Sequence, residues 1–599
     1  MKHTINDTIK SVGNTLSSSL YMMKLVHNAD RTYIILRAIY SAIQISFTYP
    51  LIMLPGSLID ELGANEKNIK LIIFLATIIV AIPLVIAVIN HLFSMLLSKK
   101  QLQIKKTIEI NFYKKVSSMD YETFNDPELS VIRNRSQSTL YAAVNTVDQI
   151  EQLLRAIITL IMVTTIVSRL NFFIVFLIIF MIVINSILTA SYNRRHYEFK
   201  QEQQNNNKFI FSYSSVLTSE FYAKEQKVYC FGGYFLSLLN EAIEKMNLLI
   251  YNDQKTEKKA NTLISFSDFI KNGIVYAYLI YQVICHGLSI GSYTIYLSAV
   301  SRFTSAFDTV ANAWLSMTNS KLYINDLIDF MNRPSRQYES GRIKAPKGEN
   351  LEFEFKNVSF KYPGTDNYVL HNLNLTIKDS EMLGIVGENG AGKSTIVKLL
   401  TRMYWVTEGE ILLNGKSIYD YDLESYLRLF APIFQDFALY PLSLKENIVM
   451  ADKYDEKRFT SICEKLSIDS FANKYDSAYD VPITRALYNN GIDPSGGECQ
   501  KIALARAVYH NADLYIMDEP TASIDPITEY RFYEQFSELT KNKSAILITH
   551  RLSALQLVDK VAVIDNGQVV EYGTHKELYA KGGLYAKMFD KQAQFYKDN

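Results

Sequence analysis

The sequence predicts a multidomain membrane protein, in which an all-α domain of six spanning helices precedes a soluble α/β domain. Long uncharged stretches lie almost entirely before residue 320, whereas the later residues alternate charged and apolar side chains. The later part also contains a glycine-rich loop, residues 387–395, between an apolar strand and an amphipathic run. The 599 residues therefore divide into two parts of different chemistry.

The clearest span is residues 71–97, which contain no Asp, Glu, Lys or Arg and exceed the about 20 apolar residues that cross a bilayer. Cations are abundant in residues 99–147 and 194–259, so both segments and both chain termini are expected in the cytosol. These segments are too long for simple loops and are expected to extend the helices, reversing near Tyr121–Glu128 and Glu220–Val228. The other spans are expected at residues 34–54, 150–168, 172–192, 263–285 and 292–317.

Composition excludes several classes of function. A net charge of +1 lacks the basic field that holds nucleic acid, so no nucleic-acid partner is expected. The four cysteines have no paired spacing, which argues against both a disulfide framework and a zinc site. The first thirty residues lack the short apolar core of a cleaved signal peptide.

The glycine-rich loop matches the pattern G-x-x-x-x-G-K-[S/T] at every fixed position, between the strand 382–386 and the helical run 394–400. Glycines let backbone N–H groups turn toward a phosphate, and the following helix N-terminus favours an anion. Lys393 is placed to reach the β- and γ-phosphates, and the Ser394 hydroxyl to bind Mg²⁺. The nine loop residues are Gly387, Glu388, Asn389, Gly390, Ala391, Gly392, Lys393, Ser394 and Thr395.

Further strands are expected at 351–360, 370–377, 513–518 and 544–549. The third ends in Asp518, which can hold Mg²⁺, and Glu519 follows in a position to orient the attacking water. The fourth ends at His550. Ser495–Glu498 opens the helical run 499–509, so its N–H groups can also face an anion.

Residues 345–590 resemble the nucleotide-binding domain of ATP-binding cassette (ABC) transporters, because seven motifs occur in that family's order. The resemblance assigns adenine stacking to Tyr362, the Walker A loop to residues 387–395, and the Q-loop to Gln435. It assigns the signature to Ser495, Gly496, Gly497 and Glu498, Walker B to Leu514–Asp518 with Glu519, the D-loop to Ser523–Asp525, and the switch histidine to His550. The six spans resemble the exporter class of the same family. The resemblance also implies that the α/β P-loop ATPase domain has antiparallel β and helical subdomains.

The resemblance implies an ATP- and Mg²⁺-dependent half-transporter of the bacterial plasma membrane, surrounded by lipid, with its ATPase domain in the cytosol. Glu519 and His550 are then catalytic, Ser394, Gln435 and Asp518 hold the metal, and the signature serves the partner's ATP site. The expected boundaries are an N-terminal cytosolic segment at 1–30, a membrane domain at 31–320, a linker at 321–344, the ATPase domain at 345–590 and a tail at 591–599.

The arrangement of Gly491–Lys501 and the Asn-Asp-Pro-Glu stretch at 125–128 most resemble exporters of modified peptides such as lantibiotics. Alternatives are a lipid or drug exporter, or a cassette protein that ATP gates without pumping. The signature departs from the usual Leu-Ser-Gly-Gly-Gln at Pro494 and Glu498. The intact Walker A loop, Gln435, Glu519 and His550 predict a homodimer, and the altered signature leaves a heterodimer with a related half-transporter as the alternative.

Four charges, Asp268, Lys271, Arg302 and Asp308, fall in or beside the last two spans, where ionisable residues are costly. Lys271 and Asp308 lie at matching depths, which predicts an ion pair between them. Arg302 lies near the middle of the membrane and is the candidate for contact with substrate.

Overall fold

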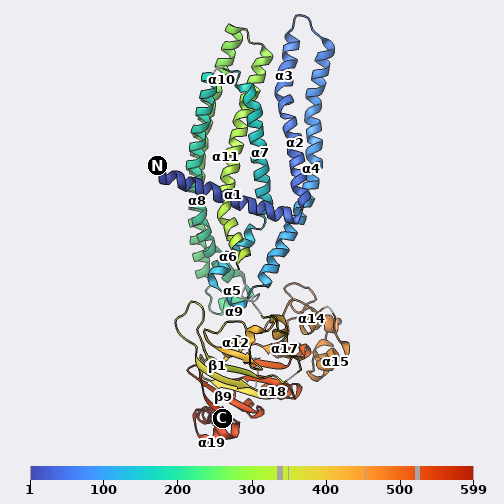
Figure 1. Ribbon diagram of the computed structural model, residues 1–599, viewed down its shortest axis with the longest axis vertical. Helices are drawn as coiled ribbons and strands as arrows, with labels where there is room; N and C mark the ends of the chain where they lie inside the picture. The colour runs from blue at the N-terminus through green and yellow to red at the C-terminus, as the bar shows by residue number, and fades with distance from the viewer. Residues whose placement is uncertain are drawn as a thin grey trace. The chain divides into compact units, whose positions relative to one another are not determined.

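The computed structural model describes residues 2–170, 172–333, 341–348, 350–451, 453–519 and 526–597. The chain divides into two compact units, which are coloured by position in the chain in Figure 1. The helical unit comprises residues 1–117 and 128–333, and the α/β unit comprises residues 118–127 and 334–599. The short segment 118–127 thus packs with a different unit from the helices that flank it in the chain.

The helical unit contains helices much longer than a membrane is thick. The 49 residues of α4 extend about 74 Å at about 1.5 Å per residue, against about 30 Å of bilayer hydrocarbon. The helices are α1 (Lys2–Ala29), α2 (Arg31–Ser46), α3 (Thr48–Gly63), α4 (Ile69–Ser117), α6 (Pro127–Thr139), α7 (Ala142–Val167), α8 (Phe172–Thr218), α9 (Glu220–Val228), α10 (Gly232–His286) and α11 (Ile290–Asn332).

Among the described residues, five helical stretches are long and apolar enough to cross a membrane. The first joins α2 and α3, which meet at Phe47, and the others lie in α4, α7, α8 and α10. The sixth expected span, 292–317, lies within α11, which does not reach the same apolar criterion over the described residues. A sixth crossing of the membrane by residues 292–317 therefore stays a prediction.

Helix α1 was not expected from the sequence, which indicated only a cytosolic segment at 1–30. In Figure 1 it crosses the long helices of its unit, and it packs against α7 and α11. Met22 and Val26 are fully buried there, and the Ser18 hydroxyl donates to Asn325 Oδ1 of α11 at 2.7 Å. The segment is mostly polar, so its apolar face became evident only through these contacts.

The α/β unit contains two sheets, which confirms the predicted α/β domain with an antiparallel part. The larger sheet has the order β10-β9-β3-β8-β7-β6, and the smaller antiparallel sheet has the order β2-β1-β4-β5. The strands are β1 (Phe353–Phe360), β2 (Leu370–Ile377), β3 (Met382–Gly387), β4 (Glu408–Leu413), β5 (Lys416–Ser417), β6 (Phe430–Ile433), β7 (Leu514–Asp518), β8 (Ser544–Ile548), β9 (Lys560–Asp565) and β10 (Gln568–Gly573).

Helices accompany the two sheets, and α14, α15 and α17 pack together. The helices of this unit are α5 (Tyr121–Phe124), α12 (Lys393–Leu400), α13 (Leu423–Leu427), α14 (Leu444–Val449), α15 (Glu456–Lys465), α16 (Asp469–Ala472), α17 (Gly496–His510), α18 (Pro526–Leu539), α19 (His575–Lys581) and α20 (Leu584–Lys597).

The strand order determines where the candidate site forms. Strands β3, β8 and β7 are adjacent and parallel, with Ile385 and Asp518 both paired to Ile548. Because parallel strands end at the same edge of a sheet, the segments that follow all three lie side by side. The glycine-rich loop, Glu519 and His550 are therefore brought together.

Candidate functional site

The glycine-rich loop connects the buried strand β3 to α12. Gly390 and Gly392 adopt φ values of +83° and +100°, which side-chain-bearing residues rarely reach. Lys393 is only 5% exposed, and its ammonium donates to the carbonyl oxygens of Gly387 at 3.1 Å and Glu388 at 3.0 Å. Burial lowers the pKa of Lys393, while the carboxylates of Glu519 and Asp518 oppose that shift. Two backbone carbonyl groups of the loop thus hold the Lys393 ammonium in place.

Asp518 ends β7 and is buried beside the loop. Its Oδ1 accepts a hydrogen bond from the Ser394 hydroxyl at 3.1 Å. Burial raises the pKa of Asp518, and the Ser394 hydrogen bond partly offsets that shift. A hydroxyl and a carboxylate at this separation are both oxygen ligands of the kind that Mg²⁺ prefers.

Glu519 and His550 form a contact between the ends of two adjacent strands. Glu519 has a φ of +44°, and its backbone N–H donates to Ile548 O at 3.0 Å. His550 Nε2 lies 2.7 Å from Glu519 Oε1. Burial raises the pKa of Glu519 and lowers that of His550. When Nε2 carries a proton, the imidazole donates it to Glu519 Oε1. The positive φ of Glu519 is a conformation that residues with a side chain seldom adopt.

Lys393, Ser394, Glu519 and His550 line one cavity of about 540 Å³, and Asp518 lies behind Ser394. Ten of its lining residues were predicted from the sequence, and Val369, just before β2, was not. Nothing in the sequence distinguishes this valine, because only the fold brings it near Gly392. The lining residues are Tyr362, Val369, Asn389, Gly390, Gly392, Lys393, Ser394, Thr395, Gln435, Glu519 and His550.

Tyr362 connects this cavity to the antiparallel sheet. Its hydroxyl and that of Thr395 are 3.0 Å apart and share a hydrogen bond. The ammonium of Lys398 lies over the Tyr362 ring, 5.6 Å from its centroid. The ring is thus held at the edge of the cavity from two sides.

The predicted signature lies elsewhere in this unit. Ser495 is the N-cap of α17, and none of Ser495–Glu498 is among the described residues that line the cavity. Glu498 turns back onto Ser495, so its carboxylate is engaged at the helix N-terminus. The predicted D-loop, Ser523–Asp525, lies outside the described residues.

A separate cavity of about 570 Å³ lies in the helical unit between α3, α10 and α11. Arg302, Asp268, Lys271 and Asp308 all line it. Lys271 is buried and pairs with Asp268 of its own helix, Nζ to Oδ1 at 2.7 Å. The expected pair between Lys271 and Asp308 is therefore wrong, because a carboxylate three residues away on the same helix is closer than one on α11 at similar depth.

A second cavity, of about 600 Å³, lies between α7 and α11. Amide and hydroxyl side chains dominate its lining, including Asn145, Gln152 and Asn312. Gln149 Nε2 donates to Ser316 Oγ at 2.7 Å, while Gln149 Oε1 is buried and accepts no hydrogen bond from the described residues. The sequence did not predict this cavity.

Both membrane cavities share one face of α11. Polar residues recur there every three or four positions, which places them in one line along the helix. These polar side chains lower the hydropathy of the expected span 292–317, which is not among the five stretches that could cross a membrane in the described part of the chain. The members of this line, each of which lines one of the two cavities, are Ser298, Ser301, Ser305, Asp308, Asn312 and Ser316.

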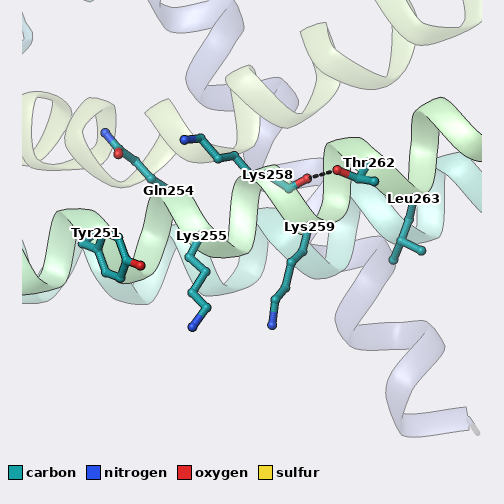
Figure 2. Close-up of a pocket in the computed structure, with 7 residues that line it drawn as sticks. All are labelled: Tyr251, Gln254, Lys255, Lys258, Lys259, Thr262 and Leu263. Atoms are coloured by element: carbon teal, nitrogen blue, oxygen red, sulfur yellow. Dashed lines mark hydrogen bonds between the residues drawn. The ribbon is translucent and has the colours of Figure 1, made fainter.

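A third hollow of the helical unit is basic and holds none of the predicted site residues (Figure 2). All its lining residues belong to α10, and Lys255 and Lys259 extend to the same side of the helix. Thr262 Oγ1 donates to the Lys258 carbonyl one turn earlier, at 2.8 Å. These exposed lysines directly precede the apolar stretch that begins at Leu263, as the charge rule for cytosolic segments anticipates.

Comparison with known proteins agrees with this geometry. Residues 370–522 match the family described as ABC transporter. The chain is 29% identical to the subtilin transport ATP-binding protein SpaT of Bacillus subtilis, over 94% of this chain and 92% of that protein. It is 25% identical to the nisin transport ATP-binding protein NisT of Lactococcus lactis, over 99% and 98%.

A solved structure of a bacterial Atm1-family ABC exporter with ATP bound has the same fold, with a TM-score of 0.81 at 19% identity. That similarity covers 94% of this chain and 98% of the solved one. An ATP-dependent lipid A-core flippase of Haemophilus ducreyi is 28% identical over 63% of this chain and 65% of its own. The chain therefore contains an ABC transporter ATPase domain and has the fold of ABC exporters, which indicates membrane transport coupled to an ATPase.

Proposed function

We propose that this chain exports a modified peptide across the bacterial plasma membrane, using ATP bound between two copies of itself. One observation carries the ATPase part: Lys393, Gln435, Glu519 and His550 line a single cavity, although they are far apart in the sequence. The peptide part is supported by similarity to two proteins named for transport of subtilin and nisin, each over almost its full length.

Each nucleotide-site residue takes a role that its position supports. Tyr362 stacks on the adenine, and the loop residues with Lys393 hold the phosphates. Glu519 orients and deprotonates the attacking water, and His550 contacts the γ-phosphate. The observed Glu519–His550 contact then opens to admit the phosphate and water between the two side chains.

The residues at the end of β7 fit Mg²⁺. Ser394 and Asp518 would hold the ion with Gln435, and the ion would neutralise charge on the β- and γ-phosphates. The described residues contain no cluster of three or more His, Cys, Asp or Glu that could form an all-protein metal cage. A Mg²⁺ ion that takes part of its coordination from nucleotide needs few protein ligands, which suits this donor set.

The test of the ATPase assignment is Glu519→Gln, which keeps the shape of the side chain and removes the base. MgATP affinity should stay within about twofold, and turnover should fall by roughly 10²-fold or more. Glu410→Gln, at an exposed position on β4, is the matched control and should hydrolyse ATP normally. Near-normal hydrolysis by the Glu519 variant would contradict the role given to this carboxylate.

The signature implies a dimer. Ser495–Glu498 lie away from the chain's own cavity, so they are available to complete the site of a second copy. Two-fold symmetry then builds two equivalent sites from one kind of chain. The purified chain expressed alone should be a two-chain particle with MgATPase activity. A stable but inactive particle that a second, related subunit rescues would instead establish a heterodimer.

The two cavities along α11 support a peptide as the cargo. One offers two cations and two carboxylates, which suit charged termini and side chains, and the other offers amides and hydroxyls, which suit backbone N–H and C=O groups. Arg302 lines the charged cavity and is exposed there. We assign Arg302 to substrate contact, through a carboxylate or carbonyl oxygen of the cargo.

Transport into inside-out vesicles distinguishes the candidate cargoes. Modified peptides should stimulate ATPase and accumulate against a gradient, and Arg302→Gln should raise the half-maximal peptide concentration roughly tenfold without changing basal hydrolysis. Similarity to a lipid A-core flippase is the observation that favours a lipid exporter. Stimulation by lipids alone would establish that alternative, and ATP-dependent but downhill flux would establish a gated protein.

A further inference from the structure

An aromatic cluster connects segment 118–127 to the nucleotide cavity. Tyr404 lies four residues after the end of α12 and is only 5% exposed. Its ring centroid is 5.2 Å from that of Tyr362, with the rings at 88°, and 5.7 Å from that of Tyr121 in α5, at 82°. One buried ring therefore contacts both a lining residue of the cavity and the short helix α5.

Further contacts hold this cluster in one arrangement. Phe360 packs against both Tyr362 and Tyr404, at 5.0 and 5.7 Å between centroids. Asn125, at the end of α5, donates from Nδ2 to the Tyr404 hydroxyl at 3.4 Å. Perpendicular ring pairs have a preferred geometry, so rotation of one ring disturbs its neighbour. The Tyr362 ring is in turn tied to the phosphate loop through Thr395.

The chain itself carries movement of α5 to the helical unit. Asp120 caps α5, accepting from the Thr123 N–H at 3.1 Å, so the segment is a defined element. Helix α4 ends at Ser117 and α6 begins at Pro127, which leaves only a few residues on either side of α5. Any displacement of α5 is thus passed by covalent connection to two helices of the helical unit.

We propose that Tyr404 is a positioning residue that links base stacking on Tyr362 to the position of α5. The inference rests on the proposed function in one respect, namely that a nucleotide base stacks on Tyr362. A base over Tyr362 restricts that ring, the perpendicular contact restricts Tyr404, and Tyr404 then holds Tyr121 and Asn125 in place. An inorganic polyphosphate bound by the loop carries no base, so it cannot restrict the Tyr362 ring by stacking. Such a link is a coupling free energy between base binding and the position of α5. The position of α5 must therefore change the affinity for the base as much as the base changes the position of α5.

Hydrogen exchange of the full-length protein tests the link. MgATP should slow exchange in residues 118–127 roughly fivefold or more relative to magnesium tripolyphosphate, which has no base. Tyr404→Leu should abolish this difference, and Tyr404→Phe, which keeps the ring, should retain most of it. Tyr572→Leu, an exposed position on β10, is the matched control and should behave like the unchanged protein.

Tyr121→Leu reaches the same contact from the side of α5, at a residue that is 41% exposed. It should also abolish the difference, and adding Tyr404→Leu should have no further effect. Both variants should lower the ratio of substrate-stimulated to basal ATPase activity while basal hydrolysis persists. Equal protection by MgATP and tripolyphosphate in the unchanged protein, or a preserved difference in both leucine variants, would overturn the proposal. Failure of MgATP to protect residues 387–395 would instead refute the nucleotide site itself.

Discussion

The carboxylate of Glu498 accepts two hydrogen bonds from Ser495, one from its backbone N–H and one from its hydroxyl, each at 2.8 Å. Glu498 occupies the third position of α17, where a carboxylate satisfies N–H groups that have no partner in the helix. A negative charge at a helix N-terminus also interacts favourably with the helix dipole. The departure from the usual signature residue is thus an internal cap of α17.

Two substitutions of Glu498 should distinguish the effect of its capping hydrogen bonds from the effect of its negative charge. Glu498→Ala removes the acceptor and should cost about 0.5–2 kcal/mol of stability, seen as a lower midpoint of thermal unfolding. Glu498→Gln keeps an acceptor but removes the charge near a partner's polyphosphate, so MgATPase activity should be equal to or above the unchanged rate. Glu446→Ala breaks the same kind of cap at α14 and is the control, with lower stability and unchanged catalysis. A fall in activity for Glu498→Gln would show that the charge itself is needed.

Lys393→Ala should weaken nucleotide binding. The ammonium is fixed beside the carbonyls of Gly387 and Glu388, and we expect it to be the cation nearest to bound phosphates. Loss of one charge-assisted interaction corresponds to roughly 10- to 100-fold in the dissociation constant of MgATP. Calorimetry on the purified protein measures it, with the exposed Lys416→Ala as control. An unchanged affinity would place the phosphates elsewhere.

Helix α9 should dock on the partner's α/β unit. None of its residues is buried, and Phe221 and Val228 are 84% and 78% exposed. Cysteines introduced at Tyr222 and Asp436, with Cys230 replaced by serine, should crosslink between chains. Co-expression of two differently tagged copies, one for each cysteine, measures this directly. Crosslinks that form only within a chain carrying both cysteines would refute the exchanged arrangement.

The thiol of Cys463 should resist modification over a wide pH range. It is fully buried in α15, and burial raises its pKa to about 12. The reactive thiolate is therefore scarce at pH 8 and still scarce at pH 10. Maleimide labelling followed by mass spectrometry should find exposed Cys230 modified and Cys463 unmodified until the protein is denatured. Labelling of both at similar rates in the native protein would contradict the burial.

The nucleotide-site motifs could be read from the sequence because their chemistry depends on local spacing. Gly390 and Gly392 both lie within the three residues before Lys393. Asp518 and Glu519 are consecutive at the end of an apolar strand. Such patterns rest on contacts between near neighbours, so they need no knowledge of the fold. The reversal expected near Glu220–Val228 also rested on local signals, and the structure has the short helix α9 at these residues.

Relationships between distant segments required the tertiary structure. The partner of Lys271 is Asp268 rather than Asp308, and depth along a helix does not specify which face a side chain occupies. Tyr404 has no distinguishing pattern around it and becomes informative only where β1, the segment after α12 and α5 converge. Local propensity and periodicity thus determined strands β1, β2, β3, β7 and β8, the long apolar segments and the motifs. Packing decided the cavities, the ion pairs and the position of α5, because these depend on contacts between residues far apart in the chain.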